Sequence, residues 1–211
     1  MKNILFDLDG TLTDPSEGIL NCIEYALDKF SAEKPPRESM KKYIGPSLWD
    51  SFKELLNTDD HELATKAVLT YRERFSTVGK LENKPYEGIY ETLESLKSKN
   101  YDLYICTSKP GVFARQIAEH FEFSKYFNNI YGSNLDGTLI DKTELINHIL
   151  TSEQISPKSA SMIGDRKYDI TGAKNNSVTP FAVSYGFGTP DEHTDAKHIF
   201  SSITEISSYF L

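Results

Sequence analysis

The sequence is poor in the features that mark several large classes of protein. It has only two cysteines in 211 residues, Cys22 and Cys106, and both lie in apolar stretches. This usage is typical of reduced core thiols and argues against a disulfide-stapled secreted domain. No apolar run approaches the roughly 18–20 residues that a membrane-spanning helix needs, and the first residues lack the layout of a signal peptide. We therefore expect a cytoplasmic protein with no membrane partner.

Positive charge is also scarce. The chain has 23 lysines and arginines against 31 aspartates and glutamates, a net charge of −8. Its sequence pI is about 5.2. Binding to a nucleic-acid backbone requires a basic surface, so we expect no nucleic-acid partner. An anionic small molecule would need a local cationic pocket or a metal ion. The five histidines have no HxH or HExxH spacing, and no role is assigned to them.

Residues 15 to about 80 carry helical but no strand signals. Apolar residues recur with helical spacing over 16–30, where Asp14 is the expected N-cap and Pro15 the first helical residue. Further helices are predicted over 37–44, 47–56 and 60–78. We therefore predict an inserted helical domain at residues 15–81.

From Pro85 onward helices and strands alternate. Continuous apolar strands are predicted near 4–8, 102–107, 129–131, 161–163, 178–183 and 198–200, with helices over 87–99, 111–121, 142–151, 167–176 and 202–210. This pattern indicates an α/β core of residues 1–14 and 82–211, a Rossmann-like parallel sheet with helices on both faces. Ligands bind such sheets outside the carboxyl ends of the strands.

Two carboxylates lie at the end of the first predicted strand. Asp7 and Asp9 alternate with apolar neighbours, so they point the same way, and Gly10 then permits a sharp turn and close approach by a ligand. Two buried carboxylates at one spot are costly unless a cation lies there. We predict a Mg²⁺ site in which Asp7 is also a nucleophile and Asp9 is an acid and then a base.

Other strand ends carry groups suited to phosphate. The hydroxyl of Thr107 would hydrogen-bond a phosphate oxygen, with Ser108 as the second candidate. Lys142 opens a helical stretch, where a cation does not favour the helix dipole. Its long side chain could instead reach the nucleophile and the phosphate, and Lys109 is its nearest rival.

A second acidic strand end follows residues 161–163. Asp165 would be a metal ligand, and Asp169 could orient the metal's water or neutralise Lys142. An oxygen-rich site without a cysteine or histidine cluster suits Mg²⁺ better than Zn²⁺.

These strings together resemble the haloacid dehalogenase-like (HAD) hydrolase superfamily over essentially the whole chain. The resemblance rests on DLDGTLTD at 7–14, ICTSKP at 105–110, DK at 141–142 and IGDRKYD at 163–169. The helical insertion looks like a C1 cap, as in the phosphoglycolate phosphatase-like branch. The segments 43–47 and 132–138 fit that branch too.

The resemblance implies a role for each motif. Asp7 would accept the phosphoryl group and Asp9 would be the acid/base, giving its backbone carbonyl to the metal. Thr107 and Lys142 would clamp the phosphate, and Asp7, Asp9 and Asp165 would surround Mg²⁺. The presence of the second aspartate favours a C–O–P substrate over C–P or C–halogen cleavage. The cap would close over the site.

The leading hypothesis is a Mg²⁺-dependent phosphatase that hydrolyses a small phosphorylated metabolite through an aspartyl-phosphate. A mutase of the β-phosphoglucomutase type shares the same core residues. A non-enzymatic phospho-aspartate receiver module is the alternative from another class, although it would gain nothing from a cap and an acid/base. Phosphoglycolate, a nucleoside monophosphate, pyrophosphate and a sugar phosphate all stay open as substrates, for a monomer or a homodimer.

Overall fold

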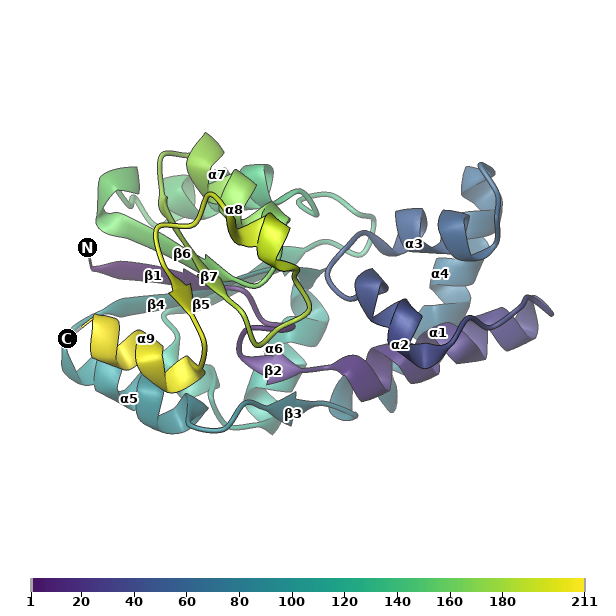
Figure 1. Ribbon diagram of the computed structural model, residues 1–211, viewed down its shortest axis with the longest axis horizontal. Coiled ribbons are helices and arrows are strands. Elements are labelled where there is room, and N and C mark those ends of the chain that lie inside the picture. Colours follow the sequence, from purple (N-terminus) through teal and green to yellow (C-terminus); the bar gives the residue numbers. More distant parts are fainter. Residues whose placement is uncertain (1, 211) are drawn as a thin grey trace. The chain divides into compact units, whose positions relative to one another are not determined.

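The computed structural model describes residues 2–210, which form two compact units (Figure 1). One unit comprises the chain up to Asp14 and from Pro85 onward, and the other is Pro15–Lys84. The predicted α/β class is confirmed in the first unit. Its six-stranded sheet has the order β5-β4-β1-β6-β7-β8, and every neighbouring pair is parallel. The strands are β1 (Asn3–Phe6), β4 (Asp102–Pro110), β5 (Asn129–Ser133), β6 (Ala160–Gly164), β7 (Thr179–Val183) and β8 (Ile199–Phe200).

Strand β1 lies between β4 and β6, and its side chains alternate between the two faces of the sheet. Ile4 and Phe6 belong to the core cluster beneath α5 (Ile89–Ser98), α6 (Gly111–His120) and α9 (Ile203–Tyr209). Leu5 belongs to the opposite cluster, beneath α7 (Lys142–Ser152) and α8 (Lys167–Asn175). Figure 1 shows these two helical layers on either side of the sheet. All three side chains are fully buried, each contributing about 1.5–3 kcal/mol to stability.

Strand β1 ends at Phe6, two residues earlier than the sequence indicates. The main chain still pairs with β6 at Asp7, whose N–H donates to the Ile163 carbonyl at 2.9 Å. It then turns at Gly10, which has a φ of +81°. The Leu8 carbonyl accepts hydrogen bonds inside this turn. The aspartates therefore lie in a turn directly beyond the strand.

The second unit consists mainly of helices. These are α1 (Ser16–Lys29), α2 (Arg37–Met40), α3 (Leu48–Leu55) and α4 (His61–Phe75), with 3₁₀ turns at Lys41–Tyr43 and Gly79–Leu81. Helix α4 packs against both α1 and α3. Ile23, Phe52 and Val68 are fully buried. The predicted helix at 37–44 is thus a short helix followed by a 3₁₀ turn.

Two details at the ends of this unit differ from the sequence-based expectation. Helix α1 begins at Ser16 with Pro15 as its N-cap residue, so the prediction that Asp14 caps it is wrong. The unit ends at Lys84, three residues beyond the predicted boundary at 81. Glu82 belongs to the helical unit because two of its residues contact it. Gly18 N–H donates to the Glu82 carbonyl, and Arg74 pairs with the Glu82 carboxylate at 2.6 Å.

The chain passes between the units through two short strands. Strands β2 (Thr13–Asp14) and β3 (Lys84–Pro85) form a separate two-stranded sheet. Within the described residues, no helix combines the length and the apolar character needed to cross a bilayer.

Candidate active site

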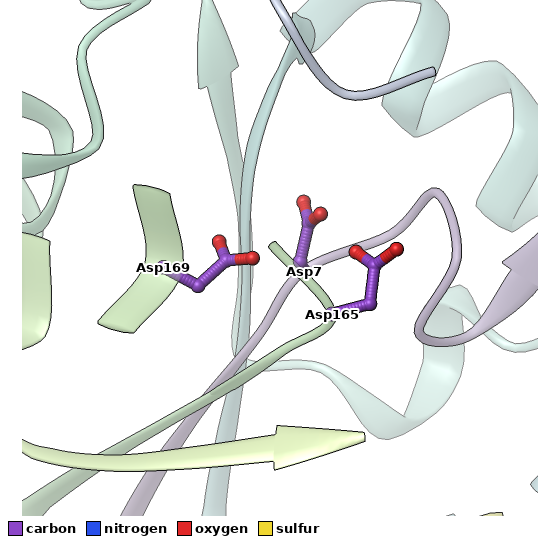
Figure 2. A group of neighbouring side chains, drawn as sticks. All are labelled: Asp7, Asp165 and Asp169. Atoms are coloured by element: carbon purple, nitrogen blue, oxygen red, sulfur yellow. The ribbon is translucent and has the colours of Figure 1, made fainter. Parts of the chain in front are cut away.

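The carboxyl ends of β1 and β6 bring three aspartates together. Asp7 follows β1, Asp165 follows β6, and Asp169 lies in the first turn of α8. One carboxylate oxygen of each lies within 4.8 Å of the others. Figure 2 shows Asp7 and Asp165 with carboxylates pointing the same way, while Asp169 reaches toward them from its helix. The parallel pairing of Phe6 with Ile163 places the two strand ends side by side.

Lys142 lies against two of these aspartates. Its Nζ is 3.0 Å from Asp7 Oδ1, and it donates hydrogen bonds to Asp169 Oδ1 and to the Cys106 carbonyl. The side chain is 4% exposed. Burial would lower the pKa of Lys142, but Asp169 and Asp7 outweigh burial and raise the pKa above its ordinary value. Lys142 is therefore a permanent cation beside Asp7, positioned because Asp141 caps the N-terminus of α7.

Lys109 has a different partner. Its Nζ lies 2.7 Å from Asp9 Oδ2, and both residues are buried. Burial raises the pKa of Asp9, and the adjacent Lys109 opposes this rise. The sequence indicated Lys109 only as a rival of Lys142. The sequence did contain a sign that Lys109 belongs to the site. It lies two residues after Thr107, and residues 107 and 109 of one strand share a face.

The other two aspartates are fixed by backbone N–H groups. Asp165 is fully buried, and its Oδ2 accepts a hydrogen bond from Phe187 N–H at 2.7 Å. Burial, with the charges of Asp7 and Asp169, raises the pKa of Asp165 well above its usual range. Asp169 Oδ2 accepts from Arg166 N–H at 3.1 Å. Burial raises the pKa of Asp169 to about 6, a rise that Lys142 opposes and Asp7 reinforces.

The predicted phosphate-binding residues lie in three different environments. Thr107 is 1% exposed, and its hydroxyl oxygen accepts from Lys109 N–H at 3.2 Å, which leaves its O–H to donate elsewhere. Ser108 donates its hydroxyl to the Ile140 carbonyl at 2.9 Å. Gly10 lies so close to Asp165 that a Cβ at this position would be 2.3 Å from Asp165 Oδ2. Only glycine fits there.

The donor set fits a hard divalent cation. Four buried carboxyl groups face two buried ammonium groups, Lys109 and Lys142, so acidic groups outnumber the lysines that contact them. Asp165 Oδ1 is buried with no hydrogen-bond partner among the described residues, and Asp7 Oδ1 has only its ion pair with Lys142. Carboxylate oxygens without N–H partners are the ligands that such cations prefer. With its side chain paired to Lys109, Asp9 retains its backbone carbonyl as the donor that the resemblance assigns to it.

One part of the site was given no role by the sequence. A loop of residues 186–193 runs against Asp165 and contributes the Phe187 N–H and His193, whose Nε2 lies 2.6 Å from the Asp165 carbonyl. His193 has no ligand spacing to other histidines, and its partner is a backbone atom, so no pattern of residue types marks it.

Comparison with known proteins identifies the family of this chain. The family model for haloacid dehalogenase-like hydrolases matches residues 4–183. A 5′-nucleotidase from Pseudomonas aeruginosa is 48% identical over 190 residues, which cover 90% of this chain and 86% of that protein. The tyrosine-protein kinase PtkA of Mycobacterium tuberculosis is 31% identical over 89% of this chain and 64% of its own length.

A solved structure agrees in fold as well as in sequence. The crystal structure of a predicted phosphatase from Clostridium acetobutylicum superposes with a TM-score of 0.94 at 43% identity, covering 99% of this chain and 97% of that one. The expectation of an enzyme of the phosphatase class is confirmed by these matches. The chain belongs to the haloacid dehalogenase-like hydrolase family and is a phosphatase of that family.

Proposed function

We propose that this enzyme is a Mg²⁺-dependent phosphomonoesterase that acts through an aspartyl-phosphate on a small phosphorylated metabolite. Nucleoside 5′-monophosphates are the proposed substrate class. The arrangement of two separate carboxylate–lysine pairs carries the proposal: Lys142 contacts Asp7, and Lys109 contacts Asp9. A nucleophile and an acid/base must act on different atoms of the substrate, and the two pairs hold them apart. The 48% identity to a 5′-nucleotidase supports the substrate class.

The residues suggest a two-step displacement. A carboxylate oxygen of Asp7 attacks phosphorus, and the bond between phosphorus and the leaving oxygen breaks. Asp9 donates its proton to that leaving oxygen, which departs as the alcohol. Burial raises the pKa of Asp9, which favours the protonated form needed for this step. Asp9 then takes a proton from water as the water attacks phosphorus, and the bond to Asp7 breaks to release phosphate.

The neighbouring residues bind and neutralise the phosphoryl group. Lys142 would pair with its oxygens as well as with Asp7, and the free O–H of Thr107 would donate to another oxygen. Asp7, Asp165 and the backbone carbonyl of Asp9 would hold Mg²⁺, with Asp169 oriented by Lys142. When bound, the metal would reduce the repulsion between an anionic substrate and an anionic nucleophile.

The two alternative functions, a receiver module and a mutase, are not equally supported. Membership of a hydrolase family argues against the receiver module. The mutase shares the nucleophile and the acid/base and differs only in where the phosphoryl group goes. The cytoplasmic location and the monomeric or homodimeric state stay predictions.

A panel of phosphorylated metabolites tests the proposal. Phosphate release is measured with Mg²⁺ from nucleoside 5′-monophosphates, phosphoglycolate, pyrophosphate and sugar phosphates, with Asp7→Asn as the matched control. We expect kcat/KM for a nucleotide to exceed that for the other substrates by about tenfold or more. If kcat/KM is highest for phosphoglycolate or pyrophosphate, that compound would replace nucleotides as the proposed substrate. Transfer to a phosphosugar without phosphate release would favour the mutase, and labelling of the chain's tyrosines by ATP would favour a kinase. Turnover of no monoester would refute the proposal.

A further inference from the structure

We propose that the loop of residues 186–193 positions Asp165 for metal binding, with His193 as its main positioning residue. The inference rests on the proposed metal site, in which Asp165 is a ligand. It concerns residues that contact this ligand and that the reaction itself does not use. The loop includes the 3₁₀ turn Pro190–His193.

The loop selects which oxygen of Asp165 stays available. Phe187 N–H donates to Oδ2 at 2.7 Å, whereas Oδ1 is buried and has no hydrogen-bond partner among the described residues. A carboxylate held by one oxygen cannot rotate without losing that hydrogen bond. The N–H of Phe187 therefore fixes the carboxylate with Oδ1 left for a cation.

His193 holds the main chain of the same aspartate. Its Nε2 lies 2.6 Å from the Asp165 carbonyl, and the residue is only 2% exposed. A carbonyl oxygen can only accept, so Nε2 carries the proton and donates it. The side chain of Asp165 is thus fixed by Phe187 and its backbone by His193.

Glycine at position 188 allows this close approach. A Cβ there would lie 1.8 Å from the Asp165 carbonyl oxygen and 2.7 Å from His193 Nε2. Any side chain would push the loop away from Asp165 and break the contact between His193 and the carbonyl. The sequence thus keeps this position free of side-chain atoms at the point where the loop passes Asp165.

The far end of the loop is tied to the start of α8. Glu192 pairs with Arg166 Nε at 3.0 Å and accepts a hydrogen bond from Lys167 N–H at 2.8 Å. Arg166 and Lys167 directly follow Asp165 in the chain. The loop therefore contacts Asp165 and both residues that follow it, and it fixes all three relative to one another.

There is an electrostatic reason for the loop to hold Asp165 in place. Asp165 is fully buried and shares its site with the carboxylates of Asp7 and Asp169. Repulsion between like charges favours any movement that separates them when no cation is bound. The loop resists this movement, so the ligand is already in place before the cation arrives. Residues of this kind typically change metal affinity about 10–100-fold when they are replaced.

Metal binding without substrate tests the inference. The metal-free protein is titrated with Mg²⁺, and the shift of its thermal unfolding midpoint gives an apparent dissociation constant. We expect His193→Leu, which removes the donor, to weaken Mg²⁺ binding about 10–100-fold. His193→Gln retains an N–H donor and is expected to restore most of the affinity. The same change at an exposed histidine, His120→Leu at the end of α6, is the matched control and should leave the affinity unchanged.

The outcomes separate this inference from the proposed function. If Mg²⁺ does not stabilise the wild-type protein, the proposed metal site fails. If Mg²⁺ binds the wild type and His193→Leu equally well, or if His193→Gln binds as weakly as His193→Leu, the positioning role of His193 is overturned. Should His193→Leu fail to fold, Glu192→Gln provides the test, because it weakens the tie to Arg166 at a partly exposed position. An unchanged affinity in that variant would then overturn the role of the loop.

Discussion

Replacing Lys142 with methionine is expected to destabilise the protein strongly when no divalent metal is present. Methionine retains an unbranched apolar side chain but removes the charge. The change leaves Asp7 and Asp169 without the ammonium group that contacts both of them. It also leaves the Cys106 carbonyl without its hydrogen-bond donor from this side chain.

The burial of the pair sets the size of the effect. The Lys142 side chain is 4% exposed and that of Asp169 is 1% exposed, so water screens the lost interaction little. Removing one partner of a buried ion pair typically costs about 3–5 kcal/mol in the free energy of unfolding. For a protein of this size each kcal/mol lowers the melting temperature by about 2–4 °C. The expected decrease is therefore about 6–20 °C.

Thermal unfolding followed by circular dichroism, first with EDTA and then with saturating Mg²⁺, measures this effect. A bound cation would supply positive charge to the same carboxylates, so Mg²⁺ should raise the melting temperature of Lys142→Met more than that of the wild type. The matched control is Lys158→Met, which changes an exposed lysine. A melting temperature for Lys142→Met within about 2 °C of the wild type in EDTA would refute the reasoning.

Four further predictions concern the reacting groups and the buried thiol. Asp7→Asn should fold normally, as judged by circular dichroism, and lose turnover; activity within about tenfold of the wild type would contradict a covalent role. Asp9→Asn should retain Mg²⁺ affinity by thermal shift while kcat falls about 10²–10⁴-fold, and a matching loss of affinity would instead make its side chain a ligand. Chelation should abolish phosphate release and Mg²⁺ should restore it, whereas Ca²⁺, with its longer bonds and higher coordination, should inhibit; full activity with Ca²⁺ would speak against the proposed geometry. Burial raises the pKa of the Cys106 thiol to about 12, so a thiol reagent at pH 8 should label it only after unfolding, and rapid labelling of the native protein would show that the site opens.

The sequence predicted the core of the fold well because its signals are local. Apolar runs such as Ile4–Phe6 mark buried parallel strands, and acidic residues directly after them mark the edge where ligands bind. The start of α1 was misplaced by one residue, because Asp14 and Pro15 both carry signals for a helix N-terminus and the structure uses the proline. Local patterns cannot choose between two such neighbours.

The parts of the site that the sequence could not predict depend on distant contacts. Lys109 lies in β4 and Lys142 opens α7, and only the folded chain shows that the first contacts Asp9 and the second contacts Asp7. Glu192 pairs with Arg166 across 26 positions in the chain, and His193 binds a backbone carbonyl. Backbone atoms are present at every position, so a contact with one of them leaves no pattern in the residue types.

The position of β1 in the sheet also bears on how the chain folds during synthesis. Asn3 pairs with Asp102 on one side and with Ala160 on the other, so the ribosome makes β1 long before either neighbouring strand. The whole helical unit is made in the interval. Until β4 and β6 have been made, the apolar residues Ile4 to Phe6 have two unpaired strand edges, which is the condition that favours aggregation of nascent chains. Pairings over such long separations also fold slowly, so Asp7 reaches its final surroundings only when most of the chain has been made.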